Sequence, residues 1–280
     1  MTLTASDVLS STIPAVAAER RSPLTAPAGK QHASTSVSKA LQLLDSFRTA
    51  GPSLGVSELA RRAGIAKSTA FRLLAFLERA GYVERVGTEY RLSWRLFELG
   101  NRVDHCRPRG LRDLALPFLS ELYVSTNNVV HLGVLEGQDV VYLEKIHGHR
   151  AIRTPSTVGG RMPAACVGLG KAMLAFSHPD TVRPVVTAGL KRRTPYSISE
   201  PGRFLGELAR VRANGVAFDR EEAALGLTCV AAPILVAGRP VAAISVSGAT
   251  SRFNANATAT LVRRAAAQIS AEYRECLEHE

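Results

Sequence analysis

The chain of 280 residues has little cysteine and no long hydrophobic run. Its four cysteines are scattered, with no CxxC pair and no histidine at ligand spacing. This pattern argues against a structural zinc site and against a disulfide framework, and it fits a reducing cytoplasm. We therefore expect no metal and no cofactor. An apolar run of about 18 residues is also missing, so we expect no transmembrane helix and no membrane partner.

The first residues lack the features of a targeting segment. They are rich in Ser, Thr, Ala and Pro, and no basic region precedes a continuous apolar core. Such a composition is not that of a secretory signal and buries too little apolar surface to fold alone. We expect residues 1–34 to be a disordered leader.

Positive charge is abundant. The 35 Lys and Arg residues exceed the 24 Asp and Glu residues and give a formal net charge of +11. An excess of this size favours a polyanionic partner such as nucleic acid. A generally basic, Arg-rich proteome would also produce it, and charge alone leaves both explanations open.

Residues 35–92 have the pattern of a winged helix-turn-helix domain. A first helix would bury Val37, Ala40, Leu41, Leu44 and Phe47, which follow helical spacing. The stretch SELARRAGIAKSTAFRLLAFLERAGYVER then predicts two helices, the first capped by its leading serine and ended by the glycine of RAG. The alternating segment YVERVGTEYRL, with its Gly-Thr turn, predicts a β-hairpin.

The second of these helices would be the recognition helix, with its N-terminal end in the major groove. Its predicted inward side is formed by Phe71, Leu74 and Leu77. No acid lies between residues 61 and 72, whereas a solvated helix surface normally mixes both charge signs. The predicted contacts with operator DNA are Arg61, Arg62, Lys67, Ser68, Thr69, Arg72 and Arg85. The alternative interpretation is a solvated basic helix pair within a larger domain.

Periodicity then predicts a linker helix over residues 93–108, ended by Pro108, and a second domain over 109–280. A helix containing Pro117 comes first, kinked or interrupted there. Strands, helices and strands follow without strict alternation. This order is typical of an α+β domain with a mostly antiparallel sheet.

Three blocks resemble the IclR family of transcriptional regulators: GVSELARRAGIAKSTAFRLLAFLERAGYVER, GGRMPAACVGLGKAMLAF, and VAFDREEAALGLTCVAAPI followed by VAAISVSG. The resemblance covers about residues 35–278. It implies a winged helix-turn-helix, a linker helix that pairs with a second chain, and a GAF-like α+β effector domain. It also implies a homodimer or homotetramer that represses or activates a catabolic operon in response to a small organic or aromatic acid.

The resemblance further implies an effector pocket. Backbone amides at the start of the GLGKA helix, at Gly168 and Leu169, would hold a carboxylate, as unpaired amides at helix N-termini do. The other contacts carried over from the family are Asp219, Cys229, Ser245 and Ser247.

Four of the pocket residues also have a plainer interpretation. Ser245 and Ser247 could lie on an exposed strand surface, Asp219 could cap a turn, and Cys229 could be a small core residue. We interpret His131 as an ordinary hydrogen-bonded histidine.

Two other function classes remain as alternatives. The first is an enzyme acting on a small carboxylic acid, with a regulatory N-terminal domain. We expect no enzyme, because no general-base histidine accompanies Cys229, Asp219 and Ser247. The second is an architectural DNA-binding protein with a purely structural second domain.

Overall fold

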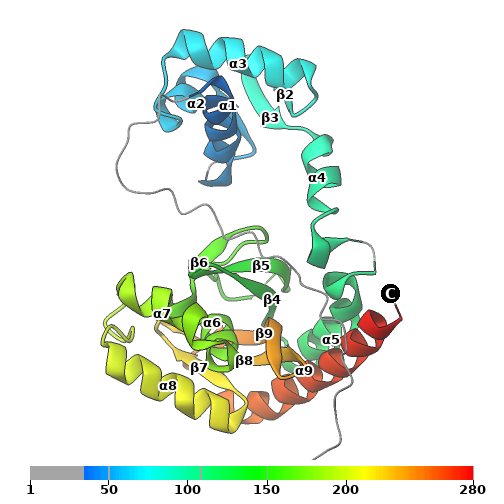
Figure 1. Ribbon diagram of the computed structural model, residues 1–280, viewed down its shortest axis with the longest axis vertical. Helices are drawn as coiled ribbons and strands as arrows, with labels where there is room; N and C mark the ends of the chain where they lie inside the picture. The colour runs from blue at the N-terminus through cyan, green and yellow to red at the C-terminus, as the bar shows by residue number, and fades with distance from the viewer. Residues whose placement is uncertain (1–34, 50, 108, 150, 280) are drawn as a thin grey trace, which may run out of the picture. The chain divides into compact units, whose positions relative to one another are not determined.

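The computed structural model describes residues 35–49, 51–107, 109–149 and 151–279. The predicted leader, residues 1–34, lies outside the described residues. The described chain forms an N-terminal helical domain with a small sheet and a C-terminal α+β domain (Figure 1). The two domains are described separately below.

The N-terminal domain is a winged helix-turn-helix, as predicted. Its three-stranded antiparallel sheet has the order β1-β3-β2, and Gly64 makes the turn between α2 and α3 with a φ of +64°. The elements are α1 (Ser36–Asp45), η1 (Ser46–Thr49), β1 (Ser53–Gly55), α2 (Val56–Arg62), α3 (Lys67–Arg79), β2 (Val83–Val86) and β3 (Glu89–Leu92).

The buried side of α1 differs from the prediction. Phe47 is buried and Ala40 and Leu44 pack against the core, as predicted. Val37 and Leu41 are instead 69% and 57% exposed, and Leu43, which was not predicted, is buried. Helical spacing permits either choice, and packing against α3 selects Leu43. The cap of α2 is also different: the helix begins at Val56 with Gly55 as N-cap, and Ser57 already lies inside it.

The predicted inward side of α3 is wrong at one position. Ala70, Leu73 and Leu74 are buried, but Phe71 is 51% exposed. The three buried residues contact the apolar side of α1 and α2 and close the core of the domain. Phe71 is therefore not part of the hydrophobic core of this domain.

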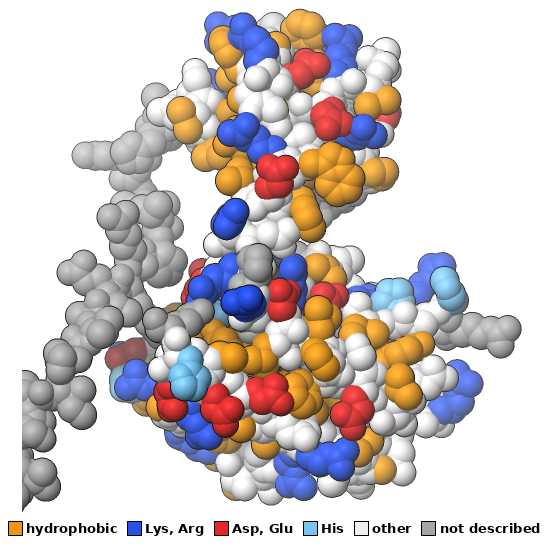
Figure 2. Space-filling model, turned by 90° about the vertical axis from the view of Figure 1, so that its right-hand side faces the viewer, with side chains coloured by type: hydrophobic (Ala, Val, Ile, Leu, Met, Phe, Trp, Pro, Cys, Tyr) orange, Lys and Arg blue, Asp and Glu red, His pale blue; other side chains and the backbone are white. Residues whose placement is uncertain are grey.

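The linker helix is shorter than predicted. Instead of extending over 93–108, α4 (Trp94–Gly100) ends at Gly100, and a 3-10 turn, η2 (Asp104–Cys106), follows. Trp94 and Phe97 are 75% and 61% exposed. Exposed hydrophobic side chains are visible on the surface drawn in Figure 2.

The C-terminal domain is built on a six-stranded antiparallel sheet with the order β6-β5-β4-β9-β8-β7, which confirms the α+β class. The elements are α5 (Leu111–Thr126), β4 (Val129–Glu136), β5 (Asp139–Ile146), β6 (Arg161–Pro163), η3 (Ala164–Cys166), α6 (Gly168–Phe176), α7 (Pro179–Thr187), α8 (Pro201–Asn214), β7 (Ala217–Arg220), β8 (Leu227–Val236), β9 (Arg239–Ala249) and α9 (Ala255–Glu278).

Helices cover both faces of this sheet (Figure 1). On one face, α5 and α9 bury Leu119 and Ile269 against Val130 and Ile244. On the other, α6 packs on the alternate residues of β8 and β9, and α8 packs on α6. Pro117 lies within α5 rather than ending it. Among the described helices, none combines the length and hydrophobicity that a bilayer crossing requires.

Candidate functional site

A small cavity lies on the α6 face of the sheet. It contains all six residues predicted for the pocket, and its volume is about 20 Å³, space for roughly one water molecule. The predicted residues that line it are Gly168, Leu169, Asp219, Cys229, Ser245 and Ser247. Residues that the sequence did not single out complete the wall, among them Tyr142, Thr154, Pro155, Ser156 and Met162.

Strand register brings the polar residues together. Asp219 on β7 is the direct neighbour of Cys229 on β8, which in turn is the neighbour of Ser247 on β9. Ser245, two residues before Ser247 and on the same face, is paired with His131 on β4. Four strands thus contribute one contiguous row of side chains.

The N-terminus of α6 forms another part of the wall. Val167 is the N-cap, so the amides of Gly168 and Leu169 belong to the first turn and have no partner within the helix. A Cβ at Gly168 would lie 3.2 Å from both Cys229 Sγ and Ala231 Cβ. A side chain here would therefore narrow the cavity, whereas glycine leaves the amides accessible to an anion.

The plainer interpretation does not fit the two serines, but burial of the cysteine is compatible with it. Ser245 and Ser247 are buried, so they do not lie on an exposed strand surface. Cys229 is buried, and burial raises the pKa of its thiol to about 12. A thiol of this kind stays protonated and is a poor nucleophile, so Cys229 serves here as a small cavity-lining side chain.

His131 lies in the cavity wall and is also hydrogen bonded. Its Nε2 is 2.7 Å from Ser156 Oγ, and the Ser156 carbonyl accepts a 2.7 Å bond from Lys145 Nζ. Burial lowers the pKa of His131 to about 3, so the imidazole is neutral. The contact with Ser156 joins positions 25 residues apart, and no local sequence pattern indicated it.

Asp219 both caps a turn and lines the cavity. Its Oδ1 accepts bonds of 2.7 Å from the Glu222 amide and 3.3 Å from the Ala223 amide. Burial raises the pKa of Asp219 to about 7 against the opposing effect of Lys171. Near neutral pH the side chain is therefore partly protonated and able to donate a hydrogen bond.

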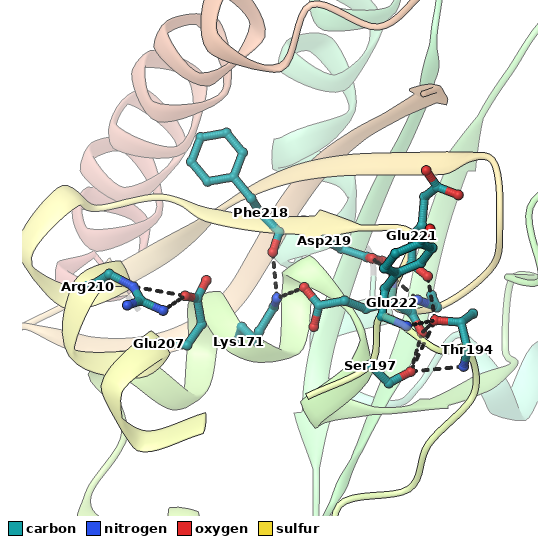
Figure 3. Close-up of polar contacts among 11 residues, drawn as sticks. Lys171, Thr194, Ser197, Glu207, Arg210, Phe218, Asp219, Glu221 and Glu222 are labelled. Carbon is teal, nitrogen blue, oxygen red and sulfur yellow. Dashed lines mark hydrogen bonds and ion pairs between the residues drawn. The ribbon is translucent and has the colours of Figure 1, made fainter. Parts of the chain in front are cut away.

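A buried ion pair holds Glu222, whose amide donates to Asp219 (Figure 3). Lys171 on α6 is fully buried, forms an ion pair with Glu222, and donates a 2.5 Å bond to the Phe218 carbonyl. The Ser197 hydroxyl donates to the Glu222 carbonyl. The sequence analysis missed this cluster, although a lysine within the apolar helix GLGKAMLAF was a signal, because a buried ammonium group needs a partner.

Five of the candidate DNA-contact residues lie on α3 and on the hairpin. Lys67, Ser68 and Arg72 on α3 are exposed, and Thr69 is half-buried. Arg85 lies on the hairpin, where its Nε donates to the Gly87 carbonyl over 3.1 Å.

The sequence predicted that the basic residues between 61 and 72 have no acidic neighbour, and this is wrong for Arg61 and Arg62. Both form ion pairs with Glu58, at 2.5 and 2.7 Å. Hydrogen bonds from Arg61 and Arg62 lower the pKa of Glu58 to about 2. The acid lies outside the stretch in sequence but three and four residues away on the helix, which places it beside both arginines.

A winged helix-turn-helix joined in one chain to a domain with a polar, anion-compatible cavity defines a ligand-responsive DNA-binding regulator. Two family descriptions match the chain: the IclR helix-turn-helix domain over residues 36–87 and the bacterial transcriptional regulator IclR C-terminal domain over residues 105–271. The chain belongs to the IclR family of transcriptional regulators.

Named relatives agree with this assignment. The chain is 33% identical over 221 residues to the HTH-type transcriptional regulator XynR of Escherichia coli (strain K12), covering 78% of this chain and 87% of the relative. It is 32% identical over 246 residues to the transcriptional repressor IclR of the same organism, covering 86% and 88%. These relatives are named as regulators, which favours regulation over the enzyme alternative.

Solved structures show the same fold. An IclR homolog from Microbacterium hydrocarbonoxydans in complex with 4-hydroxybenzoate superposes with a TM-score of 0.80 at 27% identity, covering 86% of this chain and all of the homolog. The Thermotoga maritima IclR superposes with a TM-score of 0.71 at 30% identity, covering 85% and 98%.

Proposed function

We propose that a small organic acid bound in the cavity on the α6 face controls how this regulator binds the operator of a catabolic operon. The observation that carries the proposal is the convergence of the α6 amides with Asp219, Cys229, Ser245 and Ser247 around one buried space. These groups come from one helix and three strands, and core packing alone has no need to bury so many hydrogen-bonding groups together.

The chemistry of the wall indicates the class of ligand. Among the described lining residues there is no lysine or arginine, so the amides of Gly168 and Leu169 would receive the carboxylate. The serine hydroxyls, neutral His131 and partly protonated Asp219 would pair with hydroxyl or carbonyl groups of the same molecule. This arrangement supports a hydroxylated or keto acid. The 4-hydroxybenzoate complex of the Microbacterium homolog supports the same class.

Binding requires the cavity to enlarge. A space of about 20 Å³ cannot hold an aromatic acid, whose pocket is several times larger. The segment Thr154–Pro155–Ser156 forms part of the wall, and side-chain hydrogen bonds to His131 and Lys145 hold it. We expect this segment to move outward when the ligand enters.

On the DNA side, Lys67, Ser68, Thr69 and Arg72 would enter the major groove, and Arg85 would contact the flanking backbone. Arg61 and Arg62 would contact phosphate by exchanging their bonds to Glu58 for bonds to DNA. The exposed apolar surface of α4 would pair two chains as a homodimer, and two dimers would form a homotetramer. The protein would act in the cytoplasm, with the chromosome.

The effector would act by a population shift. If the acid binds one arrangement of the paired winged domains more tightly than another, the spacing of the two recognition helices would match or mismatch the two half-sites. For each bound effector, the change in operator affinity is at most the ratio of the effector's affinities for the two arrangements, so tight binding without discrimination would change nothing.

A thermal-shift screen of the full chain tests the pocket. The panel would contain pyruvate, glyoxylate, sugar acids, and hydroxy- and amino-substituted benzoates. We expect at least one acid to raise the melting temperature of wild type and of Ser125→Ala, an exposed serine on α5, but not of Ser247→Ala. If no acid shifts the chain while operator binding persists in a gel-shift assay, the ligand class is wrong.

A further inference from the structure

Phe71 has no role in the core of the N-terminal domain. It lies in the second turn of α3 and is 51% exposed, whereas Ala70 and Leu73 beside it are buried. A half-exposed aromatic side chain leaves apolar surface in water that a partner could cover. The position of Phe71 on the recognition helix indicates what could cover it.

Three exposed residues of α3 lie next to one another. Ser68, Phe71 and Arg72 are spaced i, i+3 and i+4, so their side chains lie side by side on the helix. Phe71 is therefore adjacent to the two groups, Ser68 and Arg72, for which we propose base or phosphate contacts. Any duplex that receives those two side chains also receives the phenyl ring.

We propose that Phe71 is a specificity-determining residue that reads the 5-methyl group of a thymine in the operator. The proposal rests on the proposed DNA-contact role of α3. A phenyl ring neither donates nor accepts a strong hydrogen bond, and the thymine methyl is the apolar group that the major groove presents. Packing of the ring on this methyl removes both apolar surfaces from water and favours thymine over cytosine at that position.

A second exposed phenylalanine on the same helix provides the contrast. Phe76 is 55% exposed, but the Arg79 guanidinium lies over its ring, 4.5 Å from the centroid. It also lies farther from the N-terminal end of α3, which is the end that enters the groove. Phe76 is therefore a matched control of the same residue type and similar exposure.

The test uses an operator selected by the full chain from randomised duplexes. Each thymine of the selected site is replaced singly by deoxyuridine, which removes the methyl group and keeps base pairing. We expect one position in each half-site to lose affinity on the order of four-fold, the contribution of one buried methyl group. Phe71→Ala should bind the thymine and uracil duplexes equally, whereas Phe76→Ala should keep the four-fold difference.

Phe71→Leu separates loss of fold from loss of readout, because leucine keeps an apolar contact and should keep part of the discrimination. The proposal is overturned if an operator is selected but no thymine position responds to deoxyuridine, or if Phe71→Ala retains the response. A different outcome also overturns it: Phe71→Ala changes the molar mass in light scattering and leaves the thymine response intact. The ring would then pack against a second chain and not against DNA. Failure to select any duplex would refute the proposed DNA contacts of α3 together with this inference.

Discussion

At the residue scale, the cavity is defined by buried polar side chains whose ionisation is suppressed. Burial raises the pKa values of Asp219 and Cys229 and lowers that of His131, so each shift favours the neutral form. A wall of neutral donors and acceptors lets a single anion enter without meeting a fixed like charge. Asp219 is the exception, because its pKa of about 7 places it close to ionisation at neutral pH.

We predict that Asp219 makes stability depend on pH. Its pKa rises from 3.8 to about 7 on folding, so the folded chain binds more protons than the unfolded chain between these values. Stability from this group is therefore present at low pH and is lost as pH rises towards 7, at about 1 kcal/mol per pH unit. In Asp219→Asn the loss should disappear, and the two urea-unfolding free energies should diverge between pH 5 and 7.

The pH dependence of ligand affinity tests the same titration of Asp219 independently. A bound carboxylate disfavours the ionised form of Asp219, so wild-type affinity for the acid should fall as pH rises above 7. The asparagine variant, which cannot ionise, should bind with little pH dependence in calorimetry. Parallel pH profiles for the two proteins would mean that Asp219 does not titrate in this range.

At the element scale, α6 supports the cavity in two ways. Its N-terminus presents the amides of Gly168 and Leu169, and its fourth residue, Lys171, ties the helix to Glu222 and to the Phe218 carbonyl on β7. Close packing fixes the start of the helix as well, because a Cβ at Gly170 would lie 2.1 Å from the Ala164 carbonyl oxygen. The helix is thereby held at a defined position against the Asp219 turn.

We predict that Lys171→Met destabilises the chain by roughly 3–5 kcal/mol, because Glu222 is left as a buried charge without its partner. The double variant Lys171→Met/Glu222→Leu should recover most of this loss. The control is Arg210→Ala, which breaks the surface pair with Glu207, where the Arg210 side chain is 70% exposed; its cost should stay below about 1 kcal/mol. Equal losses in urea unfolding for the two pairs would contradict the role given to burial.

At the scale of the whole molecule, the proposed regulation needs a connection between two chains. The apolar side chains of α4 are more exposed than a monomer would favour, and Trp94 and Phe97 pack edge-to-face with centroids 6.2 Å apart. We infer that this surface is buried against the same surface of a second chain.

We predict that Trp94→Ser/Phe97→Ser weakens dimerisation and lowers operator affinity by at least about ten-fold, since two half-sites would no longer be bound together. Light scattering should show a smaller molar mass than wild type at micromolar concentration. Val124→Ser, which changes an apolar residue on α5 that is 80% exposed, should keep the wild-type mass. An unchanged mass for the α4 variant would place the dimer interface elsewhere.

The sequence by itself determined the class of each domain. Gly64 and the Gly-Thr turn mark the helix-turn-helix and its wing. These two signals are local: they depend on backbone conformations and spacings that a short segment fixes regardless of its surroundings. The set of residues that line the cavity was implied by the resemblance to the IclR family.

The tertiary structure alone decided which of several permitted arrangements occurs. Helical spacing allowed Phe71 on the inner or the outer side of α3, and packing against α1 and α2 placed it outside. The partner of Lys171 and the hydrogen bond between His131 and Ser156 join positions 51 and 25 residues apart. Their pairing follows from strand register and from the need to satisfy buried polar groups, which no local pattern encodes.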